Sequence, residues 1–185
     1  TRDRSFEFAI GDSSSIEQID RHIEEHLGPV ETVLHEIVSD LVHVDVHVVA
    51  PTPERESYSL VTSGMSDRPM ATPRDANHLK YAELMICLPA DWPLEFNGMR
   101  NEDNYWPIRA LKLLARFPHE YNTWVCSGHT VTNGNPPAAF SANTNMCCTL
   151  IGRPLRAPSA FQRLKIDDEK TINFYSLFPI YYEEM

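Results

Sequence analysis

The sequence of 185 residues is long enough for one sizeable hydrophobic core and short for two. Its 16 Lys and Arg residues against 26 Asp and Glu residues give a formal net charge of −10. This charge argues against nucleic acid or an anionic membrane surface as a partner and is compatible with a basic protein. No apolar run approaches the roughly 20 residues that cross a bilayer, and the first residues lack the apolar segment of a signal peptide.

The four cysteines show no CxxC spacing, so neither a zinc framework nor the disulfide scaffold of a small secreted protein is expected. We expect buried free thiols in a reducing compartment, and therefore a cytoplasmic protein. The residues concerned are Cys87, Cys126, Cys147 and Cys148.

Apolar residues at helical spacing predict a first helix over residues 13–27, which follows an N-terminal extension over residues 1–12. Ser14 and Glu17 fit a capping box at its start, and Gly28 ends it. His22 and His26 lie four residues apart and could hold a metal ion, but a solvated helix face is favoured.

The strictest pattern in the chain is the run LVHVDVHVVAP at residues 41–51, which predicts a strand. Its valines lie on one face and point to a core, whereas His43, Asp45 and His47 lie on the other. These three side chains could bind a metal if His35 or His129 supplied a further ligand. The alternative is a polar face that makes cross-strand hydrogen bonds.

Other segments with strand-like patterns and one more helix complete the expected domain. Together they predict an α+β fold, a single domain with a mixed, mostly antiparallel sheet of six or seven strands and two or more flanking helices. An exposed loop is expected over residues 68–80. Besides the run at 41–51, the expected strands lie at residues 30–38, 58–62, 81–88, 145–151 and 172–182, and residues 123–127 and 129–132 form one further strand or extended arm with Gly128 as a bend. The second helix lies at residues 104–117 with Asn104 as its cap and Pro107 in its first turn.

No catalytic motif stands out, since HExxH, GxSxG and the Walker loop are all missing from the sequence. Cys126 with His129 and His119 could form a thiol nucleophile and its base, but Cys and His coincide by chance in most chains of this length. We therefore predict no catalytic residue and no cofactor. The alternative is a metal-dependent hydrolase that uses the face of His43, Asp45 and His47.

Several long blocks of the sequence resemble the Suppressor of fused (SUFU) domain family, in its bacterial branch. They are GPVETVLHEIVSDLVHVDVHVV, YSLVTSGMSD, YAELMICLPADWPL, NYWPIRALKLLARFPHEYNTW, GHTVTNGNPP and KIDDEKTINFYSLFPIYYEEM. The resemblance implies a SUFU-like domain over residues 13–185 that is truncated near its C-terminal end. It also implies a mixed sheet with flanking helices and no enzymatic activity.

The resemblance further implies that the chain binds protein. Eukaryotic members restrain transcription factors of the Hedgehog pathway by gripping a short peptide as an added strand, and bacterial members act largely as immunity proteins that neutralise toxins. This chain lacks the second domain and the disordered insert of the eukaryotic members, so Hedgehog function is not expected of it. The expected partner is a basic toxin domain or an extended peptide strand; a regulatory scaffold for another partner is the alternative, and the oligomeric state stays open.

Two sets of residues are candidates for contact with that partner. The resemblance places the peptide groove near residues 63–67 and the strand that follows, and charge complementarity suggests an acidic face in the middle third of the chain. The groove set comprises Ser63, Gly64, Met65, Ser66, Asp67, Tyr81 and Glu83. The acidic set comprises Asp67, Glu83, Asp91, Glu95, Glu102 and Asp103.

Overall fold

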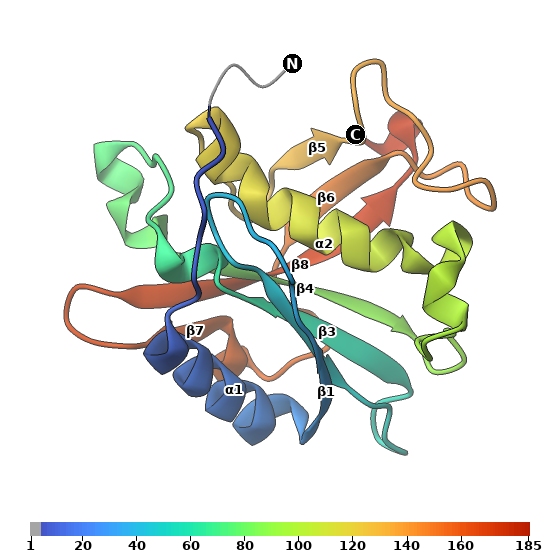
Figure 1. The fold of residues 1–185 in the computed structure, drawn as a ribbon, viewed down its shortest axis with the longest axis horizontal. Helices are drawn as coiled ribbons and strands as arrows, with labels where there is room; N and C mark the ends of the chain where they lie inside the picture. Colours follow the sequence, from blue (N-terminus) through green and yellow to red (C-terminus); the bar gives the residue numbers. More distant parts are fainter. Residues whose placement is uncertain (1–4) are drawn as a thin grey trace.

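The computed structural model describes residues 5–185, and residues 1–4 of the expected N-terminal extension lie outside the described residues. One eight-stranded sheet with two α-helices makes up the domain (Figure 1). The strands are β1 (Val30–Leu34), β2 (Asp45–Val49), β3 (Ser57–Ser63), β4 (Ala82–Pro89), β5 (Thr130–Thr132), β6 (Cys148–Gly152), β7 (Arg163–Lys165) and β8 (Thr171–Ile180); the helices are α1 (Ser13–Leu27) and α2 (Glu102–Tyr121).

The sheet has the order β1-β2-β3-β4-β8-β6-β5, and β7 pairs with the first part of β8. All pairs are antiparallel except β4 with β8. The expected α+β fold with a mixed, mostly antiparallel sheet is therefore confirmed. The additional strand, β7, was not predicted because three residues are too few to show an alternating pattern.

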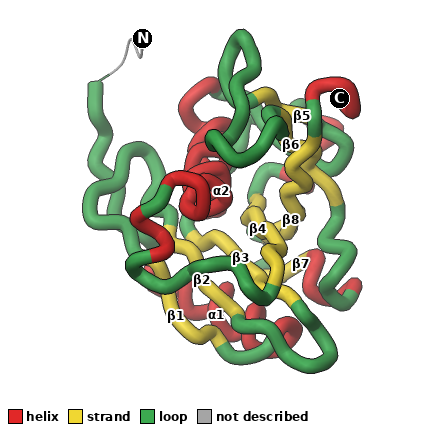
Figure 2. The backbone as a smooth tube through the Cα atoms, turned by 90° about the vertical axis from the view of Figure 1, so that its right-hand side faces the viewer, coloured by secondary structure: helices red, strands yellow, loops and turns green. Residues whose placement is uncertain are grey.

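The two helices cover opposite faces of the sheet, as the views in Figure 1 and Figure 2 show. Ile19 and Ile23 of α1 pack with Val61 and Phe174 on one face. Leu111 of α2 belongs to the larger cluster on the other face. Since strand side chains alternate between the faces, β2 directs Val44, Val46 and Val48 towards α2 and turns Asp45 and His47 towards α1.

Helix α1 has the predicted bounds but a different cap. The cap is Asp12 instead of the predicted Ser14. The Asp12 carboxylate accepts the Ser14 N–H at 3.2 Å and the Ser15 hydroxyl at 2.6 Å. The solvated face expected for His22 is wrong, because the imidazole is buried and stacks on Phe161 and Phe174 at centroid distances of 5.3 and 5.1 Å. Its Nε2 lies 3.0 Å from the Phe161 carbonyl, which supplies the hydrogen bond that a buried imidazole needs.

Several other boundaries differ from the prediction. Helix α2 starts two residues earlier than expected, with Asn101 as its cap, so Pro107 lies in the second turn. Strand β1 ends at Leu34, and residues 123–127 form no strand. In the expected exposed loop over residues 68–80, Met70 is buried. Element boundaries are the part of a fold that sequence patterns predict least precisely.

The cysteines are free, and Cys147 and Cys148 are buried as expected, whereas Cys87 and Cys126 are only partly buried. Within residues 5–185, neither helix combines the length and the apolar character that a bilayer span requires.

Candidate functional site

Three residues of the predicted groove, Gly64, Ser66 and Glu83, meet in a buried network around the Glu83 carboxylate. The Glu83 carboxylate accepts the Thr62 hydroxyl at 2.6 Å, the Gly64 N–H at 3.0 Å, and both the N–H and the hydroxyl of Ser66 at 3.0 and 2.7 Å. Burial raises the pKa of Glu83, and the hydrogen bonds from Thr62 and Ser66 oppose this rise. The network fixes the turn that leads out of β3.

Most residues of the predicted groove set have buried side chains, among them Ser63, Met65, Ser66 and Glu83. Partner contact through this set stays a prediction, and at these four residues it would require the turn to open. Gly64 is required by the backbone, since its φ is +101° and a Cβ atom there would lie 1.7 Å from the His43 carbonyl oxygen.

Two members of the set, Asp67 and Tyr81, are only partly buried, and partner contact through them stays a prediction. Asp67 accepts the Asp12 N–H at 3.1 Å, and burial raises the pKa of its carboxyl group. The Tyr81 ring lies under the ammonium groups of Lys80 and Lys170, at 5.3 and 5.4 Å from its centroid.

The three side chains of the metal hypothesis do not converge on one point. Asp45 lies between His35 Nδ1, at 2.8 Å, and His43 Nε2, at 3.1 Å. His47 turns away to Asp20 of α1 at 3.0 Å and to the Ser63 hydroxyl at 2.9 Å. Burial lowers the pKa of His47, which favours the neutral ring in these two hydrogen bonds.

Across residues 5–185, no group of three or more His, Cys, Asp or Glu side chains is arranged to hold a metal ion. The side chains of His43, Asp45 and His47 instead make hydrogen bonds within the domain. This agrees with the alternative interpretation of the run, a polar face that makes hydrogen bonds.

Two of the three residues pictured as a thiol site lie together. Cys126 Sγ is 3.6 Å from His129 Nε2, whereas His119 bonds the Met65 carbonyl at 3.0 Å. Burial raises the pKa of the Cys126 thiol, which lowers the fraction of reactive thiolate at neutral pH. A raised thiol pKa works against nucleophilic catalysis at this sulfur.

The predicted acidic face is not continuous. Glu83 is buried, and Asp67 is partly buried on the network described above. Glu102 at the start of α2 pairs with Arg109 at 2.5 Å, and Asp103 accepts the Ala142 N–H at 3.2 Å. The remaining members, Asp91 and Glu95, are exposed just before α2.

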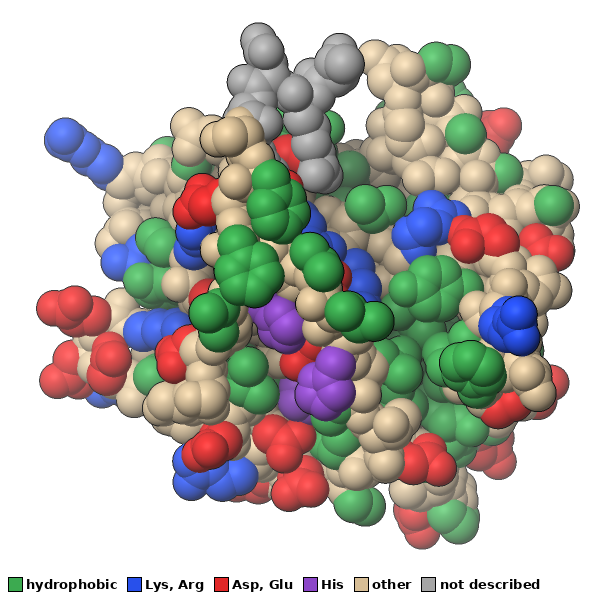
Figure 3. Space-filling view, in the orientation of Figure 1, with side chains coloured by type: hydrophobic (Ala, Val, Ile, Leu, Met, Phe, Trp, Pro, Cys, Tyr) green, Lys and Arg blue, Asp and Glu red, His purple; other side chains and the backbone are tan. Residues whose placement is uncertain are grey.

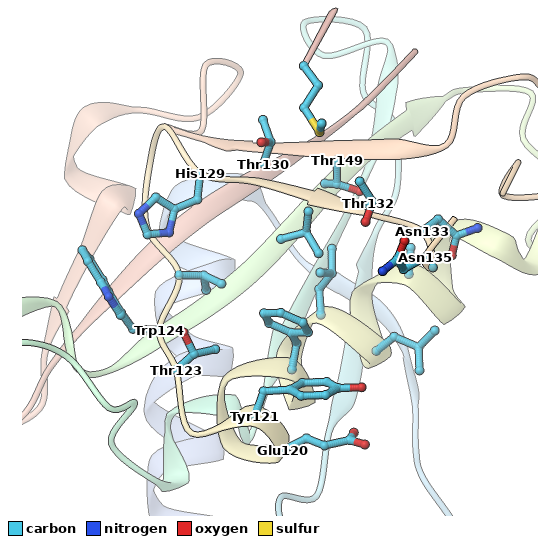
Figure 4. A pocket seen from close by; sticks show the side chains of 18 of the residues that line it. Glu120, Tyr121, Thr123, Trp124, His129, Thr130, Thr132, Asn133, Asn135 and Thr149 are labelled. Atoms are coloured by element: carbon cyan, nitrogen blue, oxygen red, sulfur yellow. The ribbon is translucent and has the colours of Figure 1, made fainter. Parts of the chain in front are cut away.

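One large hollow of the described chain was not predicted. It is a groove of about 1320 Å³ between α2 and β5, and Figure 4 shows side chains of both elements around it. We call it the β5 groove. Its lining includes Leu113, Phe117 and Tyr121 from α2, Trp124 and His129 from the connection, and Thr130, Val131 and Thr132 from β5.

The α2 wall of the β5 groove is mostly apolar and partly exposed, with Glu120 as its charged member. Leu113 and Tyr121 are exposed, and the rings of Phe117 and Tyr121 lie 4.9 Å apart. The spacing of four residues from Leu113 to Phe117 to Tyr121 forms a second apolar stripe beside the core stripe of this helix. That stripe is the sequence signal that could have revealed the groove.

Strand β5 ends the sheet and leaves one of its edges open. Ile151 donates its N–H to the His129 carbonyl at 2.8 Å, and Asn133 donates to the Cys147 carbonyl at 2.7 Å. In an antiparallel pair such bonds alternate along the strand, so the N–H groups of Thr130 and Thr132 point away from β6. An unpaired edge beside an apolar groove can accept an extended segment as a further strand.

The family model described as Suppressor of fused protein (SUFU) matches residues 40–185. The chain belongs to the SUFU family. A comparison with curated protein sequences gave no match.

Three solved structures share the SUFU fold. A SUFU homologue from Neisseria gonorrhoeae has a TM-score of 0.58 and 19% identity, over 92% of this chain and 78% of that one. The Sufu–Fu complex gives a TM-score of 0.61 and 11% identity, over 92% and 77% of the two chains. Drosophila Suppressor of Fused gives 0.55 and 11%, over 91% of this chain and 41% of its own. At these identities the likeness shows the fold alone; in the second of these structures the neighbour is in complex with Fu.

Proposed function

We propose that this SUFU domain is a non-enzymatic binding module that takes an extended segment of a protein partner into the β5 groove. The observation that supports this proposal best is the open edge of β5 beside an apolar wall. Main-chain bonds to Thr130 and Thr132 would supply affinity, and the stripe of Leu113, Phe117 and Tyr121 would select apolar side chains of the segment.

The finer proposal is that the partner is a basic toxin, which the chain neutralises by direct binding. The net charge of −10 supports it, since long-range attraction speeds the encounter with a basic partner. The resemblance to bacterial SUFU immunity proteins also supports it. The four free cysteines suit action in the reducing cytoplasm.

The open edge can be tested without disturbing the sheet. In Thr130→Pro the outward N–H is lost, whereas no bond to β6 is removed. The matched control, Thr130→Val, loses the hydroxyl group and keeps the N–H. Both variants are used as bait in host lysate, and the captured partner is quantified by mass spectrometry.

The proposal predicts that Thr130→Pro captures at least about tenfold less partner than Thr130→Val at equal folded concentration, since one main-chain bond contributes about 0.5–1.5 kcal/mol and the altered edge weakens its neighbours. Equal capture by both variants contradicts strand addition at β5. Capture that does not change between low and high salt contradicts the basic partner but leaves the groove in place. Identification of the captured protein separates a toxin from the partner of a regulatory scaffold.

A further inference from the structure

A short extended segment before α1 adds itself to the domain at a site far from β5. Phe8 forms an antiparallel bridge with Asp40, and the bonds on either side run from Ala9 N–H to the Ser39 carbonyl, at 3.2 Å, and from Leu41 N–H to the Glu7 carbonyl, at 2.9 Å. Figure 1 shows this segment beside the connection between β1 and β2. The N-terminal extension is therefore docked on the domain over residues 7–9.

Large apolar side chains of these two segments are exposed together, and we call them the N-terminal patch. Figure 3 shows hydrophobic side chains gathered beside histidines on this face. Residues 6, 8 and 10 lie on one side of the extended segment, because side chains alternate between its two sides. If the antiparallel register of Phe8 with Asp40 continues, residue 10 lies beside residue 38. The patch comprises Phe6 (59% exposed), Phe8 (63%), Ile10 (83%), Ile37 (97%) and Val38 (66%).

The patch is too large for an ordinary monomer surface. At roughly 150–200 Å² for each fully exposed large side chain, the exposed fractions correspond to about 550–740 Å² of apolar surface. Monomers rarely expose more than a few hundred Å² in one place, and a standard stable interface covers about 800 Å² on each partner. The patch alone supplies most of the area that one side of a stable dimer needs.

At Phe8, the outer edge of the segment has no hydrogen-bond partner among residues 5–185. Because the hydrogen bonds come from Glu7 and Ala9, the Phe8–Asp40 pair is of the non-hydrogen-bonded kind. The N–H and C=O of Phe8 therefore point away from Asp40. Antiparallel pairing of two such segments about a twofold axis would satisfy the main-chain groups of Phe8 in both copies at once.

The charges around the patch favour a copy of the same chain over a strongly charged partner. Glu7 contacts the guanidinium of Arg68, and the Asp40 carboxylate accepts the Glu7 N–H at 2.9 Å. Asp45 is bonded by His35 at 2.8 Å. The carboxylates beside the patch thus make contacts within the domain, and the five patch side chains are themselves uncharged, so the patch suits an apolar surface such as that of a second copy.

We propose that the N-terminal patch is the interface of a twofold-symmetric homodimer. Phe8 lies at its centre, next to the axis, and Ile10, Ile37 and Val38 bury their exposed surface against the second copy. No patch residue lines the β5 groove, so each copy keeps its groove residues outside the dimer interface. The proposal is thus independent of the proposed function.

Sedimentation velocity over a dilution series of the full chain, with Phe8→Glu and Phe96→Glu as variants, tests this proposal. Phe96 is 75% exposed outside the patch, so its variant is a matched loss of surface apolarity. The wild type is expected to sediment as a dimer of twice 21.1 kDa at high concentration. Phe8→Glu is expected to weaken dimerisation by roughly 100-fold, because the change occurs in both copies and sets two charges near the axis.

Phe96→Glu is expected to leave the dimer constant unchanged, and circular dichroism confirms that both variants are folded. Three outcomes overturn the proposal. One is a wild type that stays monomeric at all concentrations, in which case the patch would be a surface for a different protein. The others are a dimer that Phe8→Glu does not weaken and a dimer that Phe96→Glu weakens equally.

Discussion

Replacement of Glu83 tests whether the buried network holds the turn after β3. In Glu83→Ala, the N–H groups of Gly64 and Ser66 lose their acceptor in a buried place and cannot turn to another one. Each unsatisfied buried group costs about 1–3 kcal/mol, and part of this is offset because a carboxylate no longer has to be buried. We expect a loss of about 3–5 kcal/mol in the free energy of unfolding, a large share of the 5–15 kcal/mol of a typical domain.

The near-isosteric Glu83→Gln is the matched variant. The amide oxygen of the glutamine side chain can accept the same bonds from Gly64 and Ser66. The Glu83 carboxylate accepts the Thr62 hydroxyl, whereas the NH2 group of the glutamine side chain would donate to that hydroxyl. We expect a loss of only ~1–2 kcal/mol for this variant. Urea unfolding followed by circular dichroism measures both values, and a loss below ~1 kcal/mol for Glu83→Ala would refute the role given to the network.

The two variants also differ in the pH dependence that they predict. The pKa of Glu83 is raised above its ordinary value of 4.5, so the folded state holds the proton more tightly than the unfolded state does. The resulting stability is fully present below pH 4.5 and is lost as the pH rises through the folded pKa. Glu83→Gln lacks this loss, so its deficit relative to the wild type should shrink between pH 4.5 and pH 7.

Three further measurements follow from single residues. Gly64→Ala should lower the free energy of unfolding by at least ~3 kcal/mol, because its Cβ would clash with the His43 carbonyl. Gly128→Ala, where φ is +97° and no atom lies within 4 Å of the added Cβ, should lose only the ~1–2 kcal/mol that left-handed backbone costs. Equal losses in urea unfolding would contradict the clash. Burial lowers the pKa of His119, so the stability that the neutral ring contributes is present above about pH 6.5 and is lost as the pH falls through the folded pKa. His119→Gln should therefore lose less stability than the wild type between pH 7.5 and pH 5.5, by at most ~1.4 kcal/mol per pH unit. An unchanged pH dependence of the free energy of unfolding would argue against this. The Cys126 thiol should react with iodoacetamide more slowly than free cysteine at pH 7, and faster alkylation would revive the thiol nucleophile.

Much of the fold was accessible from the sequence because its strongest patterns are local. The stripe of α1 and the alternation in β2 come from periodicities that a buried face imposes. Helix α1 has the expected bounds, whereas β2 (Asp45–Val49) forms only the middle of the strand expected over residues 41–51. The alternation could not show that a helix covers the polar face of β2. His47 is buried because α1 brings Asp20 across the sheet to it, a contact between residues 27 positions apart.

The site was harder to predict for a similar reason. The small, polar residues from Ser63 to Asp67 are typical of an exposed loop, yet the carboxylate of Glu83 draws them into the interior through hydrogen bonds across β3 and β4. The edge position of β5 depends on the strand order, which a single strand does not encode. The stripe of Leu113, Phe117 and Tyr121 is a local pattern that indicates a second apolar face of α2. That this face lines a groove depends on the position of β5 beside it.

Hydrogen–deuterium exchange of the chain with and without its captured partner tests the central claim most directly. The account predicts that amides over residues 128–135 exchange at least about tenfold more slowly in the complex, because the partner strand bonds the open edge of β5. Strand β1 (Val30–Leu34), at the opposite end of the sheet, serves as the internal control and should not change. Protection confined to β1 or to residues 63–67, with β5 unchanged, would contradict binding in the β5 groove.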